Sequence, residues 1–257
     1  MFRTIFPIFA KGRILKTEML EELRNYPRDF YKIYFENYSN GIIAGTRLQV
    51  CADELIVHQG IIKFRGCLYL HLEEYQLPYQ QANREMLLKI RFLEESTEED
   101  FLLNQAEIFL DAQTTLQQNE LELGRFKLRE GASLRTDYTD FHDLSTEYNT
   151  MNIINVPYAC SGDSTLSPLL LQFFSKVVLH SNTDNALDLG FAMQCLNNEL
   201  VRRELILYYV ATRLGIPNQN YTNLELYKHL TMIIREIEGG VRRKVDNRVR
   251  SPRIIVD

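Results

Sequence analysis

The sequence predicts an α+β protein, in which an N-terminal antiparallel β-sandwich with a helical entry is followed by a small C-terminal helical bundle. Residues 42–129 contain runs of alternating apolar and polar side chains separated by short turns, which is the pattern of antiparallel strands. Residues 13–38 and 168–240 instead repeat their apolar side chains every three or four positions, as helices do. Because strands and helices are segregated along the chain, βαβ units are excluded.

The bulk composition indicates a globular protein without a membrane segment. Of 257 residues, 45% are hydrophobic and 25% are charged, and this balance excludes wholesale disorder. The most apolar stretch, residues 166–179, is too short and too polar to span a bilayer. The four cysteines form no CxxC pair, so a reducing compartment is expected. We therefore expect a protein made in the cytosol that has no membrane partner.

The helical entry carries an aromatic stripe. Thr17 is a plausible N-cap, and Pro27 is expected to interrupt the helix. Phe30, Tyr34 and Tyr38 then recur every four residues. Such a stripe is first of all a buried face, so we expect this helix to pack on the sheet.

Six strands are predicted, over residues 42–50, 54–58, 61–72, 84–95, 101–111 and 119–129. In the third, Phe64, Leu68, Leu70 and Leu72 are expected on one face, with Lys63, Arg65, Tyr69 and His71 on the other. In the fourth, Met86, Leu88, Ile90 and Phe92 are expected to oppose Lys89 and Arg91. The last strand changes parity around Gly124, which predicts a β-bulge there.

Four helices are predicted in the second half of the chain. The first starts at Pro168 after Ser167, and the second covers about 184–196. The third runs over 199–214 and ends at Gly215. The fourth opens with the capping box Thr222-x-x-Glu225 and closes at the glycine pair 239–240. Short helices with tight links predict a bundle.

No sequence motif for catalysis or a cofactor is present. The phosphate-binding loop GxxxxGK[ST], GxGxxG, GxSxG and HExxH are all absent from the sequence. Asp137, Asp140, His142 and Asp143 offer ligand types that suit a divalent ion, but their spacing matches no known site, and a solvated acidic turn is favoured. We therefore assign no catalytic residue, no metal ligand and no cofactor, and an enzyme using this cluster is the disfavoured alternative.

The carboxyl end is basic, whereas the rest of the chain is acidic. Residues 241–257 contain six basic and two acidic side chains, a net charge of +4, within a chain whose total is −5. This tail is predicted either to dock on an acidic protein surface or to bind nucleic acid. Nucleic acid is the less favoured partner, because the tail lacks aromatic residues for base stacking and the body is acidic. Its end, Arg253 to Val256, is β-prone and suits strand addition to a partner's sheet edge.

Several segments, in order, resemble one family. They are Gly12 to Leu15, Tyr38 to Gly45, Glu122 to Phe126, Val156 to Tyr158 and Asn223 to Leu230. The chain resembles the TssK-like baseplate adaptors of type VI secretion, themselves similar to receptor-binding proteins of tailed phages. It is also similar to tail-cluster proteins of clostridial prophages and of phage-tail-like bacteriocins. The resemblance covers about residues 10–238 and contains no catalytic motif.

Two departures from the family pattern matter. The Pro-x-His-Phe signature near the start of the family is absent, and Lys16 to Leu20 stands in its place. The family's membrane-complex-binding head at the carboxyl end is replaced by the basic tail. A phage or bacteriocin particle therefore fits better than docking to a secretion membrane complex.

The resemblance implies a homotrimeric structural adaptor that links the baseplate wedge to a receptor-binding fibre or a second adaptor. Such a protein would be cytoplasmic during assembly and then part of a released particle. The implied organisation is a shell-like β-rich domain with an N-terminal anchor (1–128), an extended arm (129–165), a helical bundle (166–240) and the basic tail (241–257). The residues expected to bind partners are Ile5, Phe6, Ile8, Phe9, Arg242, Arg243, Lys244, Arg248, Arg250 and Arg253. For residues 2–15, a first edge strand packed on the chain's own sheet is an equally weighted alternative.

Overall fold

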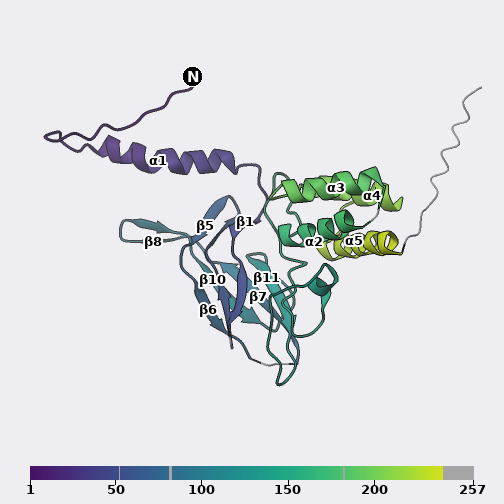
Figure 1. The fold of residues 1–257 in the computed structure, drawn as a ribbon. Helices are drawn as coiled ribbons and strands as arrows, with labels where there is room; N and C mark the ends of the chain where they lie inside the picture. The colour runs from purple at the N-terminus through teal and green to yellow at the C-terminus, as the bar shows by residue number, and fades with distance from the viewer. Residues whose placement is uncertain (52, 81–82, 182, 240–257) are drawn as a thin grey trace, which may run out of the picture.

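The computed structural model describes residues 1–51, 53–80, 83–181 and 183–239. Figure 1 shows three parts: a helix that projects to one side, a body of β-strands, and a layer of four helices beside it. The helices are α1 (Thr17–Tyr34), α2 (Pro168–His180), α3 (Ala186–Asn197), α4 (Arg203–Leu214) and α5 (Asn223–Glu238), with a 3-10 turn, η1, at His142–Ser145.

The β body is built from short antiparallel strands. They are β1 (Gly41–Gly45), β2 (Leu48–Cys51), β3 (Glu54–Val57), β4 (Gly60–Phe64), β5 (Cys67–His71), β6 (Tyr75–Pro78), β7 (Glu85–Phe92), β8 (Ser96–Glu98), β9 (Phe101–Leu103), β10 (Ala106–Asp111) and β11 (Glu120–Lys127). They form three three-stranded sheets, ordered β1-β4-β5, β2-β3-β6 and β10-β7-β11, and the hairpin β8-β9. The predicted α+β class, with antiparallel strands, a helical entry and C-terminal helices, is confirmed.

One apolar core joins the three sheets. Ile62 of β4, Val57 of β3 and Leu88 of β7 are all at most 5% exposed and belong to the same cluster. Phe64 stacks on Phe92 with ring centroids 4.0 Å apart. Burial of each such side chain contributes about 1.5–3 kcal/mol. The sheets are therefore packed face to face through their side chains.

The predicted strand over 61–72 is in fact the hairpin β4–β5. Arg65 and Gly66 have positive φ angles of 46° and 85°, which is the backbone of a two-residue hairpin turn. The turn reverses the chain, so the expected faces are wrong: Lys63 is 5% exposed, whereas Leu70 is 61% exposed. The predicted strand over 42–50 is likewise divided into β1 and β2.

The predicted bulge at Gly124 is confirmed. The register between β11 and β7 shifts between Glu122 and Gly124. A Cβ atom at Gly124 would lie 2.7 Å from Sδ of Met151. Glycine at this position therefore lets the segment that carries Met151 pack closely against β11.

Residues 129–165 lie on the body of the chain and do not leave it as an extended arm. Single β-bridges join Arg125 to Asn152, and Ile42 to Tyr158. Met151 is fully buried in the β core, and Phe141 is fully buried in the core of the helical layer. The segment therefore fills the boundary between the two cores. The division into four domains stays a prediction.

The predicted helix signals of the second half are largely confirmed. Pro168 occupies the first position of α2, and Gly215 ends α4 in the left-handed conformation. The capping box of α5 is formed in both directions between Thr222 and Glu225. The helices share one core, in which Phe191 stacks on Tyr209 with centroids 3.9 Å apart.

Two expectations about the helical entry are wrong. The helix α1 continues through Pro27 and has Lys16, not Thr17, at its N-cap position. None of its residues is buried, so its aromatic stripe does not pack on the sheet.

Candidate docking surface

The helix α1 projects from the body with its apolar side chains in solvent. Phe30 is 54% exposed and Tyr34 is 61% exposed, although the two rings stack at 5.8 Å. In Figure 1 the helix extends away from both the sheets and the helical layer. Most helical stability in proteins comes from packing an apolar face, so α1 lacks its main source of stability while this face is in solvent.

The apolar residues of α1 form a continuous seam. Met19, Leu23, Tyr26, Phe30 and Ile33 follow one another at alternating intervals of four and three residues. This is the spacing with which helices pack against one another along their length. The seam therefore has the form of a helix–helix interface, and neither the sheets nor the helical layer buries any of its residues.

The N-terminal segment runs back along α1 (Figure 1). The ring of Phe6 lies 5.8 Å from the ring of Tyr26. Ile5, Ile8 and Phe9 remain 39%, 68% and 56% exposed, and Phe6 is 71% exposed. Residues 1–16 contain no strand, so the alternative of a first edge strand packed on the chain's own sheet is wrong. Phe6 instead contacts α1 through Tyr26, and Ile5, Ile8 and Phe9 are further exposed apolar side chains of the same segment.

Lys63 attaches the C-terminal end of α1 to the β body. Its buried ammonium donates hydrogen bonds to the carbonyl oxygens of Tyr38 at 2.7 Å and of Glu36 at 3.1 Å, and also to that of Phe35. A cation at a helix C-terminus is stabilising, because the last carbonyl groups are unsatisfied and carry partial negative charge. The amide of Ser39 also donates to the carbonyl of Cys160 at 2.9 Å. The direction in which α1 projects is therefore set by specific contacts.

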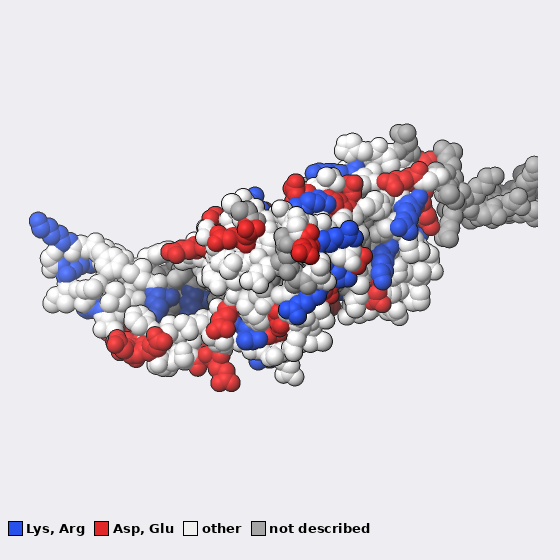
Figure 2. All heavy atoms as spheres, turned by 90° about the horizontal axis from the view of Figure 1, so that it is seen from below, with Lys and Arg blue, Asp and Glu red and all other residues white. Residues whose placement is uncertain are grey.

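The six basic tail residues expected to bind partners, Arg242, Arg243, Lys244, Arg248, Arg250 and Arg253, lie outside the described residues. On the body itself, the face seen in Figure 2 carries acidic and basic side chains interspersed over it. A stripe of basic residues would be expected for a surface that follows a phosphate backbone, and this face has none among the residues coloured.

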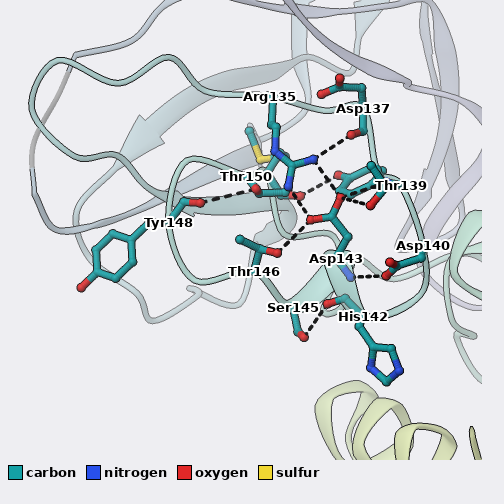
Figure 3. A network of polar contacts seen from close by, with 12 residues as sticks. Arg135, Asp137, Thr139, Asp140, His142, Asp143, Ser145, Thr146, Tyr148 and Thr150 are labelled. Carbon is teal, nitrogen blue, oxygen red and sulfur yellow. Dashed lines mark hydrogen bonds and ion pairs between the residues drawn. The ribbon is translucent and has the colours of Figure 1, made fainter.

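The acidic cluster at residues 137–143 is a structural clamp (Figure 3). Asp143 receives two hydrogen bonds from the guanidinium of Arg135, one of them from Nη1 to Oδ2 at 2.8 Å. Arg135 holds the pKa of this carboxyl well below its usual value. Asp140 accepts a hydrogen bond from the amide of Asp143 at 2.9 Å, and Asp137 contributes only its backbone carbonyl to Arg135.

Because Asp140 and Asp143 are engaged in the clamp, few side chains of the cluster are left as metal ligands. His142 is half exposed, and its imidazole lies 3.9 Å from the carboxylate of Glu238. Within the described ranges, no group of three or more histidine, cysteine, aspartate or glutamate residues has a geometry that could hold a metal ion. The cluster fastens η1 to the preceding loop.

A buried charge network was missed by the sequence analysis. The ammonium of Lys89, 1% exposed, lies 2.9 Å from Oδ2 of Asp111 and 3.3 Å from Oε2 of Glu120. Glu120 also pairs with Arg91 at 2.8 Å. Lys89 was expected on the face opposite Leu88 and Ile90, and its partners on β10 and β11 explain why a charged side chain is buried there. Since each charge is paired, the network links the three strands of the β10-β7-β11 sheet without leaving a buried charge unpaired.

None of the helices in the described part of the chain combines the length and apolarity needed to cross a membrane.

The comparisons with known proteins find structures but no sequence relatives. No family model and no curated protein matches the chain. The crystal structure of TssK is similar over 90% of this chain and 68% of that chain, with a TM-score of 0.40 and 12% sequence identity. A chain of the type VI secretion system TssK-TssF-TssG baseplate subcomplex, determined by cryo-electron microscopy, is similar over 91% of this chain and 99% of that chain. Its TM-score is 0.39 and its identity is 9%.

Proposed function

We propose that this protein is a non-enzymatic structural subunit of a baseplate in a contractile particle, and that it works as a trimeric adaptor. The observation that carries the proposal is α1, a helix with no buried residue and a continuous apolar seam. The sequence resemblance to baseplate adaptors supplies the kind of assembly in which such a helix would be covered.

The seam of α1 is the proposed contact between copies. In a symmetric assembly the same helix from each copy meets its equivalents, so one apolar seam serves as both halves of the interface. Moving a side chain such as Phe30 or Leu23 from water into this interface is worth about 1.5–3 kcal/mol. Several such side chains per copy would offset the loss of rotational and translational freedom on association.

Residues 2–15 are the proposed anchor to the baseplate wedge. They combine exposed Phe6, Ile8 and Phe9 with basic Arg3, Lys11 and Arg13, and contain no acidic residue. This chemistry fits an apolar partner groove with an acidic rim. The helical layer and the tail would then hold a receptor-binding fibre or a second adaptor. The protein would assemble in the cytoplasm and leave it within the particle.

A structural role also agrees with the surroundings of the ionisable groups. Asp143 is clamped by Arg135, and Lys89 is paired with Asp111 and Glu120. Groups that carry out acid or base chemistry need a free proton site facing a substrate. In these two clusters the charges face one another instead.

Light scattering after size exclusion tests the proposal. The full chain should elute as a trimer. The double variant Leu23→Ser/Phe30→Ser should elute as a monomer, because it places two hydroxyl groups in the seam. As a matched control, Tyr208→Ser/Met232→Ser removes two apolar side chains, 54% and 50% exposed, from the helical layer and should stay trimeric. A full chain that is monomeric alone, and also when mixed with wedge proteins, would overturn the proposal.

A further inference from the structure

Two sheet edges face one groove. The strand β5 is an outer strand of the sheet β1-β4-β5, and β10 is an outer strand of β10-β7-β11. An open groove of about 480 Å³ is lined by residues of both strands. They include Leu68 and Leu70 of β5 and Ile108 of β10. Among the described residues, no β-bridge joins β5 to β10. The groove therefore separates two edges that each lack a neighbour.

The groove leaves hydrogen-bonding capacity unused. An edge strand presents unpaired N–H and C=O groups, which is a template for another strand. In addition, Nε2 of His71, which lines the groove, is buried and has no hydrogen-bond partner among the described residues. A strand placed in the groove could pair with the free edge of β5 or of β10.

The rim of the groove is acidic. Glu107 lines it, and Glu94 and Glu95 line an adjoining pocket of about 450 Å³ that shares Tyr69 with the groove. All three carboxylates are exposed, and within the described part of the chain none of them forms an ion pair. The adjoining pocket also contains a basic residue, Arg65, whose guanidinium donates to the carbonyl of Gln118 at 3.2 Å. The groove thus favours an extended segment that is apolar and basic.

We propose that the groove between β5 and β10 receives residues 253–256 from the tail of a second copy of this chain, added as a strand. This segment consists of Arg253, Ile254, Ile255 and Val256, and β-branched residues favour strands. The tail it belongs to has a net charge of +4, which complements the acidic rim. Pro252 lies just before these four residues, and proline favours extended backbone at the residue that precedes it, Ser251.

The tail is long enough to reach a second copy. The 18 residues after Gly239 span at most roughly 60 Å when fully extended, which is ample for reaching a neighbour. In Figure 1 the end of α5 and the strand β5 lie at different sides of the molecule. The inference rests on the proposed assembly of several copies and adds to it an exchanged strand.

Photo-crosslinking in the full chain tests the inference. A benzoylphenylalanine is placed at position 255, and isotopically light and heavy copies are mixed before irradiation. The expected adducts lie on peptides containing Cys67–His71 or Ala106–Asp111 and join a light copy to a heavy copy. The charge reversal Glu94→Lys/Glu107→Lys should reduce their yield by at least fivefold. Its matched control is Glu130→Lys/Glu199→Lys, which reverses two exposed carboxylates outside the groove and should leave the yield unchanged.

The outcomes separate this inference from the proposed function. Adducts elsewhere on the chain, or adducts only within one copy, overturn the exchanged strand, and light scattering on the same sample reports the trimer independently. A trimer without groove adducts removes the inference and leaves the proposed function standing. A monomer without adducts overturns both.

Discussion

The ammonium of Lys63 lies 2.7 Å from the carbonyl oxygen of Tyr38 and thereby joins strand β4 to the root of the projecting helix. Lys63 is 5% exposed, and it also binds the carbonyl groups of Phe35 and Glu36. A buried lysine on a strand is unusual, and here it meets three carbonyl groups at the end of α1. The position of the projecting helix is therefore part of the folded structure.

Replacing Lys63 by methionine should weaken the attachment of α1 to the β body. The stem of the side chain is kept, but three carbonyl groups lose a charged donor, and a hydrogen bond to a charged group contributes about 1.5–3 kcal/mol. Urea unfolding should show that loss of stability, and limited proteolysis should cut faster between residues 34 and 41. Lys127→Met is the matched control, because Lys127 pairs with Glu147 at the surface. Equal cleavage rates in Lys63→Met and the unmodified chain would contradict the role given to Lys63.

Stability should fall in acid through the charge network of Lys89. Burial acts to raise the pKa of Glu120, but hydrogen bonds from Gln117, Arg91 and Lys89 outweigh it and lower this pKa overall. The pKa of Asp111 is lowered mainly by a hydrogen bond from the amide of Gln113 and then by Lys89. The unfolded chain then binds protons more readily than the folded chain. This contribution is complete above the unfolded pKa values, about 4, and is lost as the pH falls through the lower folded values.

The variant Glu120→Gln tests this dependence. It leaves Lys89 paired with Asp111 but removes a charged hydrogen-bond acceptor of Arg91 and Lys89, so stability at neutral pH should fall by about 1.5–3 kcal/mol. Its loss of stability between pH 5 and pH 3 should be smaller than that of the unmodified chain. Denaturant titrations at several pH values measure both. An unchanged acid dependence would show that Glu120 does not carry the effect.

The clamp between Arg135 and Asp143 should not depend on metal. Asp143→Asn removes a charged partner, and a hydrogen bond to a charged group contributes about 1.5–3 kcal/mol to stability. Treatment of the unmodified chain with a chelator should leave its thermal midpoint unchanged. A drop in that midpoint that is reversed by a divalent ion would contradict this account and restore the metal interpretation of residues 137–143.

Two glycines should respond to alanine with opposite signs. Gly124→Ala places a Cβ 2.7 Å from Sδ of Met151, so overpacking should reduce stability by about 1–3 kcal/mol. Gly190 lies inside α3, and a Cβ there meets no atom within 4 Å. Gly190→Ala should therefore increase stability by up to about 1 kcal/mol, since alanine favours the helix. Thermal unfolding of both variants gives the comparison. A loss of stability at Gly190 would contradict the space seen around it.

The predictable parts of the fold are those encoded by local signals. The capping box of Thr222, the helix stop at Gly215 and the bulge at Gly124 each depend on a few neighbouring residues, and all three are confirmed. The turn at Arg65 and Gly66 was missed because arginine rarely adopts positive φ, which leaves Gly66 as a single turn signal inside an alternating pattern.

The parts that could not be predicted depend on distant partners. Lys89 is buried because Asp111 and Glu120 lie on neighbouring strands, and periodicity along β7 carries no information about them. The stripe of Phe30 and Tyr34 was read correctly as an apolar helix face, but the sequence cannot distinguish a face that packs on its own sheet from one that is left exposed. Of the candidate docking surface, the sequence pointed to Ile5, Phe6, Ile8 and Phe9 but not to α1, and their role in binding a partner stays a prediction.

Hydrogen exchange of α1 at several protein concentrations tests most directly whether its apolar seam is a contact between copies. If the account is correct, amides of residues 17–34 are protected at high concentration, where the particle mass is three times 30.2 kDa, and lose this protection on dilution. A mass of 30.2 kDa throughout, with α1 exchanging equally fast at every concentration, would contradict it.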